Sequence, residues 1–347
     1  MALPGHIIGS ETEYGISLLG EEDFDAVTNS ILLVNSHQTT ANVIWDYEEE
    51  NPYADARGFQ VEEQLEVPSY ADNVQINKML INGARLYVDH AHPEFSTPEC
   101  SSVIELITYE KAGERIIDNC RRNANATLPP GRALIIYRNN SDQKGNSYGY
   151  HENYLMDRRA PFKLIVEHII PFLVTRQIFT GSGRIGAAEN SESWIPLHQV
   201  DSKTPGSHDA SGRLTIPYQI SQRADHIVND FFEWVQHNRS IVNTRDEPLA
   251  DPNQYRRIHL LLGDSNMAET ATALTMGTTG LVLQLIEEGH MPTGLDLDDP
   301  VLALKEISRD PDRKWIVRLA SGARASAFDI QEQFLKAAQK HYRGQDE

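Results

Sequence analysis

The stretch from residue 82 to residue 99 restricts the fold more than any other part of the chain. The pair Asn82-Gly83 is typical of a tight turn that leads into a strand, since both residue types tolerate a positive φ. The alternation that follows predicts a strand with one polar face and one mixed, partly apolar face. The polar face would carry Arg85, Tyr87 and Asp89, and the other face Leu86, Val88 and His90; Glu94 follows just past the strand. Because a solvated edge strand would show a similar alternation, this stretch indicates a site only if other strands supply partners.

Three further strands carry polar residues two positions apart, which places each pair on one face of its strand. The pairs are Glu11 with Glu13, His151 with Asn153, and Arg257 with His259. Two acids on one strand face repel each other unless a cation or solvent screens them. We therefore expect the four strands to form one face of a curved, antiparallel sheet that holds hard cations. Carboxylate oxygens favour Mg²⁺ and arginines bind phosphate oxygens, so the pattern predicts a metal–nucleotide site. No G-x-x-x-x-G-K-[ST] occurs, which excludes a Walker-type ATPase.

The rest of the chain predicts alternating helices and strands without an internal repeat. Helices are expected at residues 103–123, 161–180, 268–288 and 327–342, and strands at 6–17, 134–137, 147–156, 255–264 and 312–319. Pro171 should kink or break the second helix. Residues 21–69 are polar and acidic without a clear period, which predicts a long loop or insertion, either functional or disordered. The G-x-G-x-x-G at residues 181–186 is discounted as a dinucleotide site because a helix precedes it and a polar loop, 190–212, follows; Arg184 there could still reach an anion.

Composition sets the class of protein and its compartment. The 347 residues carry a net charge of −19, which argues against a general binder of nucleic acid or of anionic membranes. The two cysteines, Cys100 and Cys120, form no C-x-x-C pair, so we expect free thiols and no structural zinc site. The first residues do not resemble a signal peptide, and no stretch approaches the roughly 20 apolar residues of a membrane helix. These features predict a soluble, cytoplasmic protein.

Five stretches together resemble a known family. They are Gly-Ser-Glu-Thr-Glu-Tyr-Gly-Ile from Gly9, Asn-Gly-Ala-Arg-Leu-Tyr-Val-Asp-His-Ala-His-Pro-Glu from Asn82, Ser-Tyr-Gly-Tyr-His-Glu-Asn-Tyr-Leu-Met from Ser147, Asn-Thr-Arg-Asp-Glu-Pro from Asn243, and Arg-Arg-Ile-His from Arg256. The pattern resembles the carboxylate–amine ligase superfamily, which includes glutamine synthetase. Within it, the chain is similar to the family of the ligases and deamidases that act on Pup, the prokaryotic ubiquitin-like protein. The resemblance implies an α+β fold, a glutamine synthetase-like curved, mainly antiparallel sheet packed by helices, with the active site on its concave face.

Two features are similar to the deamidases of this family. Glu13 and Asp89 are 76 positions apart (89 − 13), which leaves room for the long acidic loop that the deamidases have and the ligases lack. The motif Asp-His-Ala-His-Pro-Glu from Asp89 also matches the deamidase version. We therefore expect one catalytic domain over residues 1–347, with an acidic mobile loop at about 35–70. The resemblance also implies a small C-terminal domain that helps to form the adenine pocket, and we expect this chain to lack it.

The resemblance implies an amide and isopeptide hydrolase with Mg²⁺ and ATP as bound cofactors. It would deamidate the C-terminal Gln of Pup to Glu and remove Pup from substrate lysines. Asp89 carries over as the catalytic residue, either as a nucleophile that forms an anhydride or as a base for water, with Arg85 favouring its ionised form. Metal ligands carried over are Glu11, Tyr87, Glu94, His151 and His259, where Tyr87 would act through water. Nucleotide contacts carried over are Gly9, Ser10, Glu11, Thr12, Glu13, Arg85, Ser96, Thr97, Pro98, Glu99, Asn153 and Arg257.

The implied partners are Pup, pupylated proteins and the proteasomal ATPase. Pup is acidic, so a local basic groove is expected despite the net charge. Arg121, Arg122, Arg158 and Arg159 are candidates for it, and the alternative reading is a set of solvated arginines. Two other functions remain open: a Pup–protein ligase, and a non-catalytic protein that binds Pup or a nucleotide.

Overall fold

The computed structural model describes residues 6–21, 24–41, 43–47, 53–61, 68–142, 146–185, 218–233 and 239–343. The chain divides into two compact units. Unit 1 comprises Met1–Asn139, Tyr148–Arg159 and Thr244–Leu261, and unit 2 comprises Asn140–Ser147, Ala160–Asn243 and Leu262–Glu347. Compact units within a chain are not by themselves separate domains, so the extent of the catalytic domain stays a prediction.

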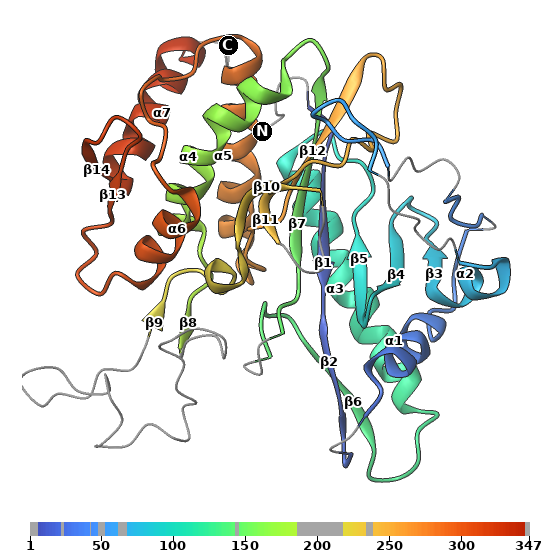
Figure 1. The fold of residues 1–347 in the computed structure, drawn as a ribbon. Coiled ribbons are helices and arrows are strands. Elements are labelled where there is room, and N and C mark those ends of the chain that lie inside the picture. Colours follow the sequence, from blue (N-terminus) through green and yellow to red (C-terminus); the bar gives the residue numbers. More distant parts are fainter. Residues whose placement is uncertain are drawn as a thin grey trace, which may run out of the picture. The chain divides into compact units, whose positions relative to one another are not determined.

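Unit 1 is built on an antiparallel sheet that contains all four of the strands expected to carry the site (Figure 1). Its strand order is β12 (Tyr255–Leu260), β7 (Tyr150–Asp157), β1 (Ile8–Glu13), β5 (His92–Ser96), β4 (Arg85–Asp89) and β3 (Asn77–Met79). Every neighbouring pair in this order is antiparallel. The prediction of a mainly antiparallel sheet is confirmed.

The strand register collects the predicted pairs on one face of this sheet. Glu11 lies opposite His151 on β7 and opposite Ser96 on β5. Glu94 lies opposite Glu13 on one side and Tyr87 on the other. Since residues directly opposite in a sheet point to the same side, these side chains share a polar face, and the alternate residues point to the other.

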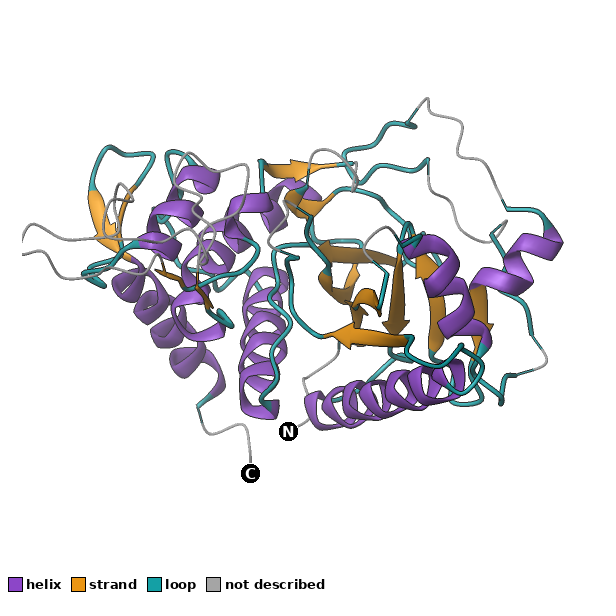
Figure 2. Cartoon of the chain, turned by 90° about the horizontal axis from the view of Figure 1, so that it is seen from below, coloured by secondary structure: helices purple, strands orange, loops and turns teal. Residues whose placement is uncertain are grey.

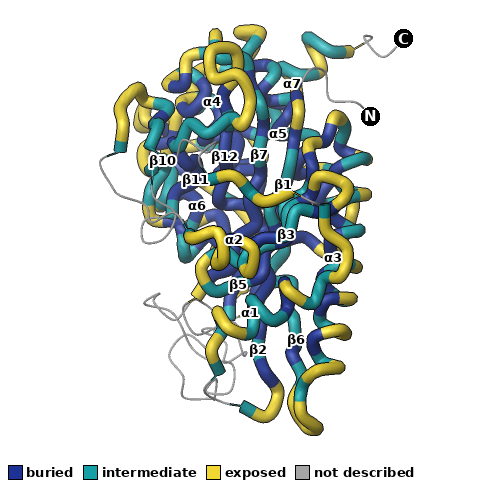
Figure 3. The backbone as a smooth tube through the Cα atoms, turned by 90° about the vertical axis from the view of Figure 1, so that its right-hand side faces the viewer, coloured by how far each residue is buried: buried dark blue, intermediate teal, exposed yellow. Residues whose placement is uncertain are grey.

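The other face of the sheet is mainly apolar over β4 and β5, where it packs on α1 (Ala26–Asn35) and α3 (Val103–Asn125). Leu86 and Phe95 from the sheet and Leu33 from α1 are at most 1% exposed. A Cβ on Gly113 of α3 would lie 2.5 Å from Cε1 of Phe95, so the glycine allows the helix its close approach. Figure 2 shows helices beside the strands of this unit, and Figure 3 shows buried residues along β7 and β12.

The expected strand at residues 6–17 is in fact two strands. β1 ends at Glu13, and β2 (Gly15–Leu19) leaves the sheet to pair with β6 (Ala133–Tyr137). The main-chain N–H of Tyr14, between them, donates to the carbonyl of Pro93. A Cβ on Gly15 would lie 2.5 Å from the ring of Tyr148. Tertiary contacts therefore set the break, and sequence alternation alone did not reveal it.

The expected long loop at residues 21–69 was wrong in part, because it contains α1. Asp25 caps α1 by accepting from the N–H groups of Val27 and Thr28. Leu33 and Val34 are fully buried against the sheet, which stabilises a helix whose sequence is short and weakly periodic. A second helix, α2 (Tyr70–Ile76), precedes β3. Residues 48–52 and 62–67 of the expected acidic loop lie outside the described residues.

Unit 2 is mainly helical. Its helices are α4 (Phe162–Thr180), α5 (Glu269–Glu287), α6 (Pro300–Arg309) and α7 (Ala327–Tyr342). α5, α6 and α7 all contact α4, and the rings of Phe172 and Phe334 meet edge to face at 5.3 Å. The short elements are β8 (Arg184–Ile185), β9 (Tyr218–Gln219), the 3₁₀ turn η2 (Ala224–His226), the parallel pair β10 (Asn229–Phe232) and β11 (Ser240–Asn243), and the hairpin β13 (Ile316–Arg318) and β14 (Arg324–Ser326).

The four expected helices are confirmed within two residues at each end, but Pro171 does not break α4. The helix continues because its residues are buried on nearly all sides by α5, α6 and α7, which outweighs the hydrogen bond that proline cannot donate. The expected strand at 312–319 shrinks to β13, because Arg313 and Trp315 take positive φ values of 56° and 49°. The expected loop at 190–212 lies outside the described residues. No helix in the described ranges has the length and apolarity needed to cross a bilayer.

Candidate active site

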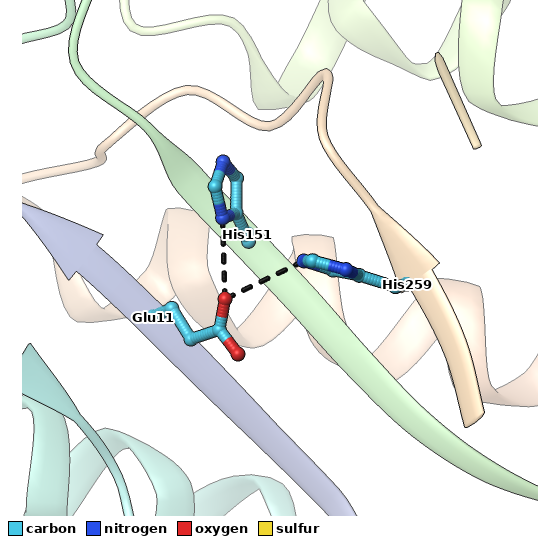
Figure 4. A group of neighbouring side chains, drawn as sticks. All are labelled: Glu11, His151 and His259. Carbon is cyan, nitrogen blue, oxygen red and sulfur yellow. Dashed lines mark hydrogen bonds and ion pairs between the residues drawn. The ribbon is translucent and has the colours of Figure 1, made fainter. Parts of the chain in front are cut away.

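A carboxylate and two imidazoles meet near the middle of the polar face (Figure 4). Oε2 of Glu11 lies 3.2 Å from Nδ1 of His151 and 3.4 Å from Nε2 of His259. The two rings meet edge to face with their centroids 5.2 Å apart. One ligand atom from each residue lies within 4.8 Å of the others, a grouping suited to a single metal ion.

The second oxygen of Glu11 is held by two donors. Oε1 accepts from Nη2 of Arg257 at 2.9 Å and from Nδ2 of Asn153 at 3.1 Å. Nε of Arg257 donates to Oδ1 of Asn153, and its Nη1 lies 3.3 Å from Glu247. Burial opposes ionisation of Glu11, but Arg257 and His259 hold the pKa of its carboxyl well below the usual value. Burial and the nearby Arg257 lower the pKa of His259 to about 3, so its imidazole stays neutral and able to bind a metal.

A second group consists of the carboxylates of Glu13, Asp89 and Glu94, again with one oxygen from each within 4.8 Å of the others. Glu94 is 1% exposed. Burial and the negative charges of Asp89, Glu11 and Glu13 raise the pKa of Glu94 well above its usual value. Burial and the Glu94 carboxylate likewise raise the pKa of Tyr87 well above 10, so its phenol keeps its proton.

Two histidines and a glycine, which sequence reasoning did not select, line this acidic group. Nδ1 of His92 lies 3.3 Å from Glu13, and Nδ1 of His90 lies 3.0 Å from Asp89. A Cβ on Gly149 would lie 2.5 Å from Nε2 of His151 and closer still to Oε1 of Glu13. The absence of a side chain at Gly149 therefore allows the two groups to approach each other. His92 stood within a quoted motif, but no periodicity distinguished it.

The polar face fits divalent cations. Three carboxylates close together are unfavourable without positive charge, and Oε1 of Glu94 is buried and makes no hydrogen bond to any described residue. Nε2 of His259 is buried and faces Oε2 of Glu11 at 3.4 Å. The all-oxygen group matches Mg²⁺ best, and the group with two imidazoles also suits softer divalent ions. The residues predicted as metal ligands are thus brought together, with Glu13 as an additional candidate.

The predicted nucleotide contacts divide between the two faces. Glu11, Glu13, Asn153, Arg257 and Ser96 lie on the polar face, as does the Cα of Gly9 opposite Asn153. Ser10 and Thr12 alternate to the other face, where both are at most 2% exposed.

Of the remaining residues of that set, Arg85 lies on β4 and three follow β5. The hydroxyl of Thr97 accepts from the main chain of Ser10, Pro98 is buried, and Glu99 is exposed. The side chains of Ser10 and Thr12 are thus not available to a ligand on the polar face.

The four arginines expected to line a basic groove are each paired with an acid. Arg121 and Arg122 contact Asp118 one turn earlier on α3. Arg158 forms a forked pair with Asp246 at 2.6 and 2.8 Å. Arg159 contacts Asp157. This pairing favours the alternative reading, in which these arginines stabilise local structure.

The antiparallel sheet with carboxylates and imidazoles on its polar face defines a glutamine synthetase-like protein of the carboxylate–amine ligase superfamily. The model of the family described as Pup-ligase protein matches residues 6–347, and the chain belongs to this family.

Relatives and solved structures agree with this assignment. The chain is 43% identical to a depupylase of Acidothermus cellulolyticus and 41% identical to a Pup deamidase/depupylase of Mycolicibacterium smegmatis, each over 96% of the chain. It spans 64% of the length of both relatives. Relatives named Pup–protein ligases match over 76–78% of the chain.

The ligase PafA in complex with Pup superimposes with a TM-score of 0.71 at 32% identity, over 98% of this chain and 58% of that one. A structure of PafA in complex with ADP gives a TM-score of 0.63 at 35% identity, over 82% of this chain and 60% of that one.

Proposed function

We propose that the protein is a hydrolase that deamidates the C-terminal Gln of Pup and releases Pup from substrate lysines. The observation that carries the proposal is the extent of the match: relatives named deamidase or depupylase align over 96% of the chain, and those named ligase over 76–78%. Both reactions break an amide at the same side-chain carbonyl carbon of Pup's last residue. One site therefore serves both.

In this proposal Asp89 is the catalytic residue. Its carboxylate is one-third exposed at the end of β4, so a substrate carbonyl can reach it. Asp89 either attacks the carbonyl carbon, forming an anhydride that water then opens, or removes a proton from an attacking water. In both routes the C–N bond breaks, the nitrogen leaves as ammonia or as the lysine amine, and the acyl group ends as a carboxylate.

The remaining groups of the polar face would bind metal and nucleotide. Glu11, His151 and His259 would hold one divalent cation, and Glu94 and Glu13, with Tyr87 through water, a second. When bound, Mg²⁺ would supply positive charge that favours the ionised form of Asp89 and polarises the carbonyl. Arg257 and Asn153 would contact the phosphates. The ADP complex of PafA supports the binding of a nucleotide. ATP would serve as a bound cofactor, because amide hydrolysis needs no fuel.

A direct assay tests the proposal. The protein is incubated with Pup ending in Gln, MgCl₂ and ATP, and Pup is weighed by mass spectrometry. Deamidation raises the mass of Pup by about one dalton, because OH replaces NH₂. If Pup ending in Glu is instead consumed with ADP formation and joined to a lysine, the protein is a ligase. If Pup binds but keeps its mass, the protein is a non-catalytic binder; either result rejects the proposal.

A further inference from the structure

The guanidinium of Arg85 contacts two aromatic rings. Its central carbon is 3.9 Å from the ring centroid of Trp45 and 3.9 Å from that of Tyr87. Tyr87 is two residues away on β4, whereas Trp45 comes from a separate stretch, residues 43–47, that precedes α2 and β3. A cation over an aromatic face is attracted by the ring quadrupole, and the contact shifts a docking equilibrium by about 2- to 30-fold. Arg85 thus draws Trp45 onto the polar face.

Hydrogen bonds fix the same stretch at three further points. Nε of Arg85 donates to Oδ1 of Asn77 at 2.8 Å, and its Nη2 lies 3.4 Å from the hydroxyl of Tyr47. Nδ2 of Asn77 donates to that hydroxyl at 3.0 Å. Nδ2 of Asn73, on α2, donates to the main-chain carbonyl of Trp45 at 2.8 Å. Both asparagines are buried, so these bonds are shielded from competition with water.

This arrangement differs from that of a phosphate-binding arginine. Such an arginine offers a forked edge of N–H groups to the ligand. Nε and Nη2 of Arg85 instead face Asn77 and Tyr47, and its central carbon lies over the rings of Trp45 and Tyr87. The N–H groups of Arg257 also bond to side chains, those of Asn153, Glu247 and Glu11, so the contact with the rings of Trp45 and Tyr87 is what distinguishes Arg85.

We propose that Arg85 is the docking residue for residues 43–47 and that the nucleotide does not use it. When residues 43–47 are docked, Trp45 and Tyr47 form an aromatic wall of the site beside Tyr87. This wall lies toward the edge of the sheet where β4 pairs with β3. The wall positions the end of Pup relative to Asp89; this last step rests on the proposed function, whereas the docking does not.

A second anchor on the same stretch of chain provides an internal control. The carboxylate of Asp55, which is 4% exposed, accepts from Arg57 and, at 2.6 Å, from the hydroxyl of Thr244. Main-chain bonds join Ala56 to Thr244 and Asp246 to Ala54. Removing the Thr244 hydroxyl should therefore weaken the attachment of residues 53–61 and leave residues 43–47 docked.

The test is hydrogen exchange of residues 43–47 together with Mg-ATP affinity. Trp45→Ala and Arg85→Gln should each speed the exchange of residues 43–47 at least about threefold and leave the dissociation constant of Mg-ATP within about twofold. Trp45→Phe, which keeps a ring, should restore most of the protection. The effects of the two substitutions should be less than additive in the double variant, because both remove the contact between Arg85 and Trp45. Arg122→Gln, an exposed arginine on α3, and Thr244→Val should leave residues 43–47 unchanged.

Two outcomes would overturn the inference. A loss of Mg-ATP affinity of tenfold or more in Arg85→Gln, with unchanged exchange, would make Arg85 a nucleotide ligand. Additive effects of Trp45→Ala and Arg85→Gln would mean that the residues act separately. Trp45→Ala leaves every strand of the sheet intact, so it reports on docking even if Arg85→Gln fails to fold. Turnover of Pup in Trp45→Ala should fall through kcat; if no variant or wild-type protein turns over, the proposed function fails while the docking result stands.

Discussion

Asp89 ends β4 with acids on one side and an imidazole on the other. Replacing it by Asn keeps the shape and removes the charge and the nucleophilic oxygen. We expect Asp89→Asn to lower Pup turnover at least about 1,000-fold and to leave Mg-ATP and Pup binding within a fewfold. Single-turnover assays with separate binding measurements check this. A loss of binding as large as the loss of turnover would give Asp89 a structural role.

Glu11 contacts more of the site than any other single carboxylate described above. It bridges the two imidazoles with one oxygen and Arg257 and Asn153 with the other. Glu11→Gln removes the charge that a cation needs, so we expect affinity for Mn²⁺, used as a probe, to fall at least about tenfold.

Calorimetric titration measures the Mn²⁺ affinity of Glu11→Gln. Glu247→Gln is the matched control, because Glu247 contacts Arg257 but belongs to neither group of ligands. Equal losses in both variants would show that the charge of the face, rather than ligation by Glu11, controls affinity.

At the scale of elements, the sheet separates chemistry on one face from packing on the other. Gly149 precedes β7 and admits the side chains of Glu13 and His151. In Gly149→Ala the new Cβ would displace both, and because these are the ends of side chains the fold should tolerate the shift. We expect Mn²⁺ affinity and turnover to fall at least about tenfold, with little change in the midpoint of urea unfolding.

Gly113→Ala makes the matched change on the apolar side of the same sheet. Its Cβ would meet the Phe95 ring inside the core, where displaced atoms have no free space. Overpacking should cost about 1–3 kcal/mol of the free energy of unfolding, offset by up to about 1 kcal/mol of helix propensity. Urea unfolding measures this, and Mn²⁺ affinity of the folded variant should be unchanged. If Gly113→Ala lost metal binding and Gly149→Ala lost stability, the assignment of the two faces would be wrong.

At the scale of the whole molecule, a half-buried histidine makes stability depend on pH. His226 in unit 2 faces Arg223, Arg239 and Arg184 and the acid Asp225. Burial and the three arginines lower its pKa to about 4 from an ordinary 6.5. As pH falls below 6.5, His226 becomes protonated in the unfolded chain and stays neutral in the folded chain. The free energy of unfolding should therefore fall by up to about 1.4 kcal/mol per pH unit, until pH reaches about 4.

Urea unfolding at pH 7.5 and 5.5 measures this loss. His226→Gln cannot titrate, so its loss of stability between the two pH values should be smaller than that of the wild type. An equal loss in both proteins would assign the pH dependence to other groups.

Much of the site was predictable because it depends on local alternation and on motifs. Glu11 with Glu13, Tyr87 with Asp89, and His151 with Asn153 share strand faces by the two-residue period of a strand, whatever the strands pair with. The motifs then ordered these strands around one face. The long helices were predicted for the same reason, because the roughly 3.6-residue spacing of apolar residues is visible in the local sequence.

Tertiary structure alone decided how these local pieces combine. The strand register places Glu13, Asp89 and Glu94 in one group and Glu11 with both histidines in another, because pairing between strands distant in sequence sets which atoms meet. Asn73 on α2 and Asn77 on β3 hold the stretch that places Trp45 against Arg85. Pro171 stays helical because other helices surround α4. The residue types and faces of this protein were thus readable from its sequence, whereas the groups that act together depend on long-range packing, which no local period encodes.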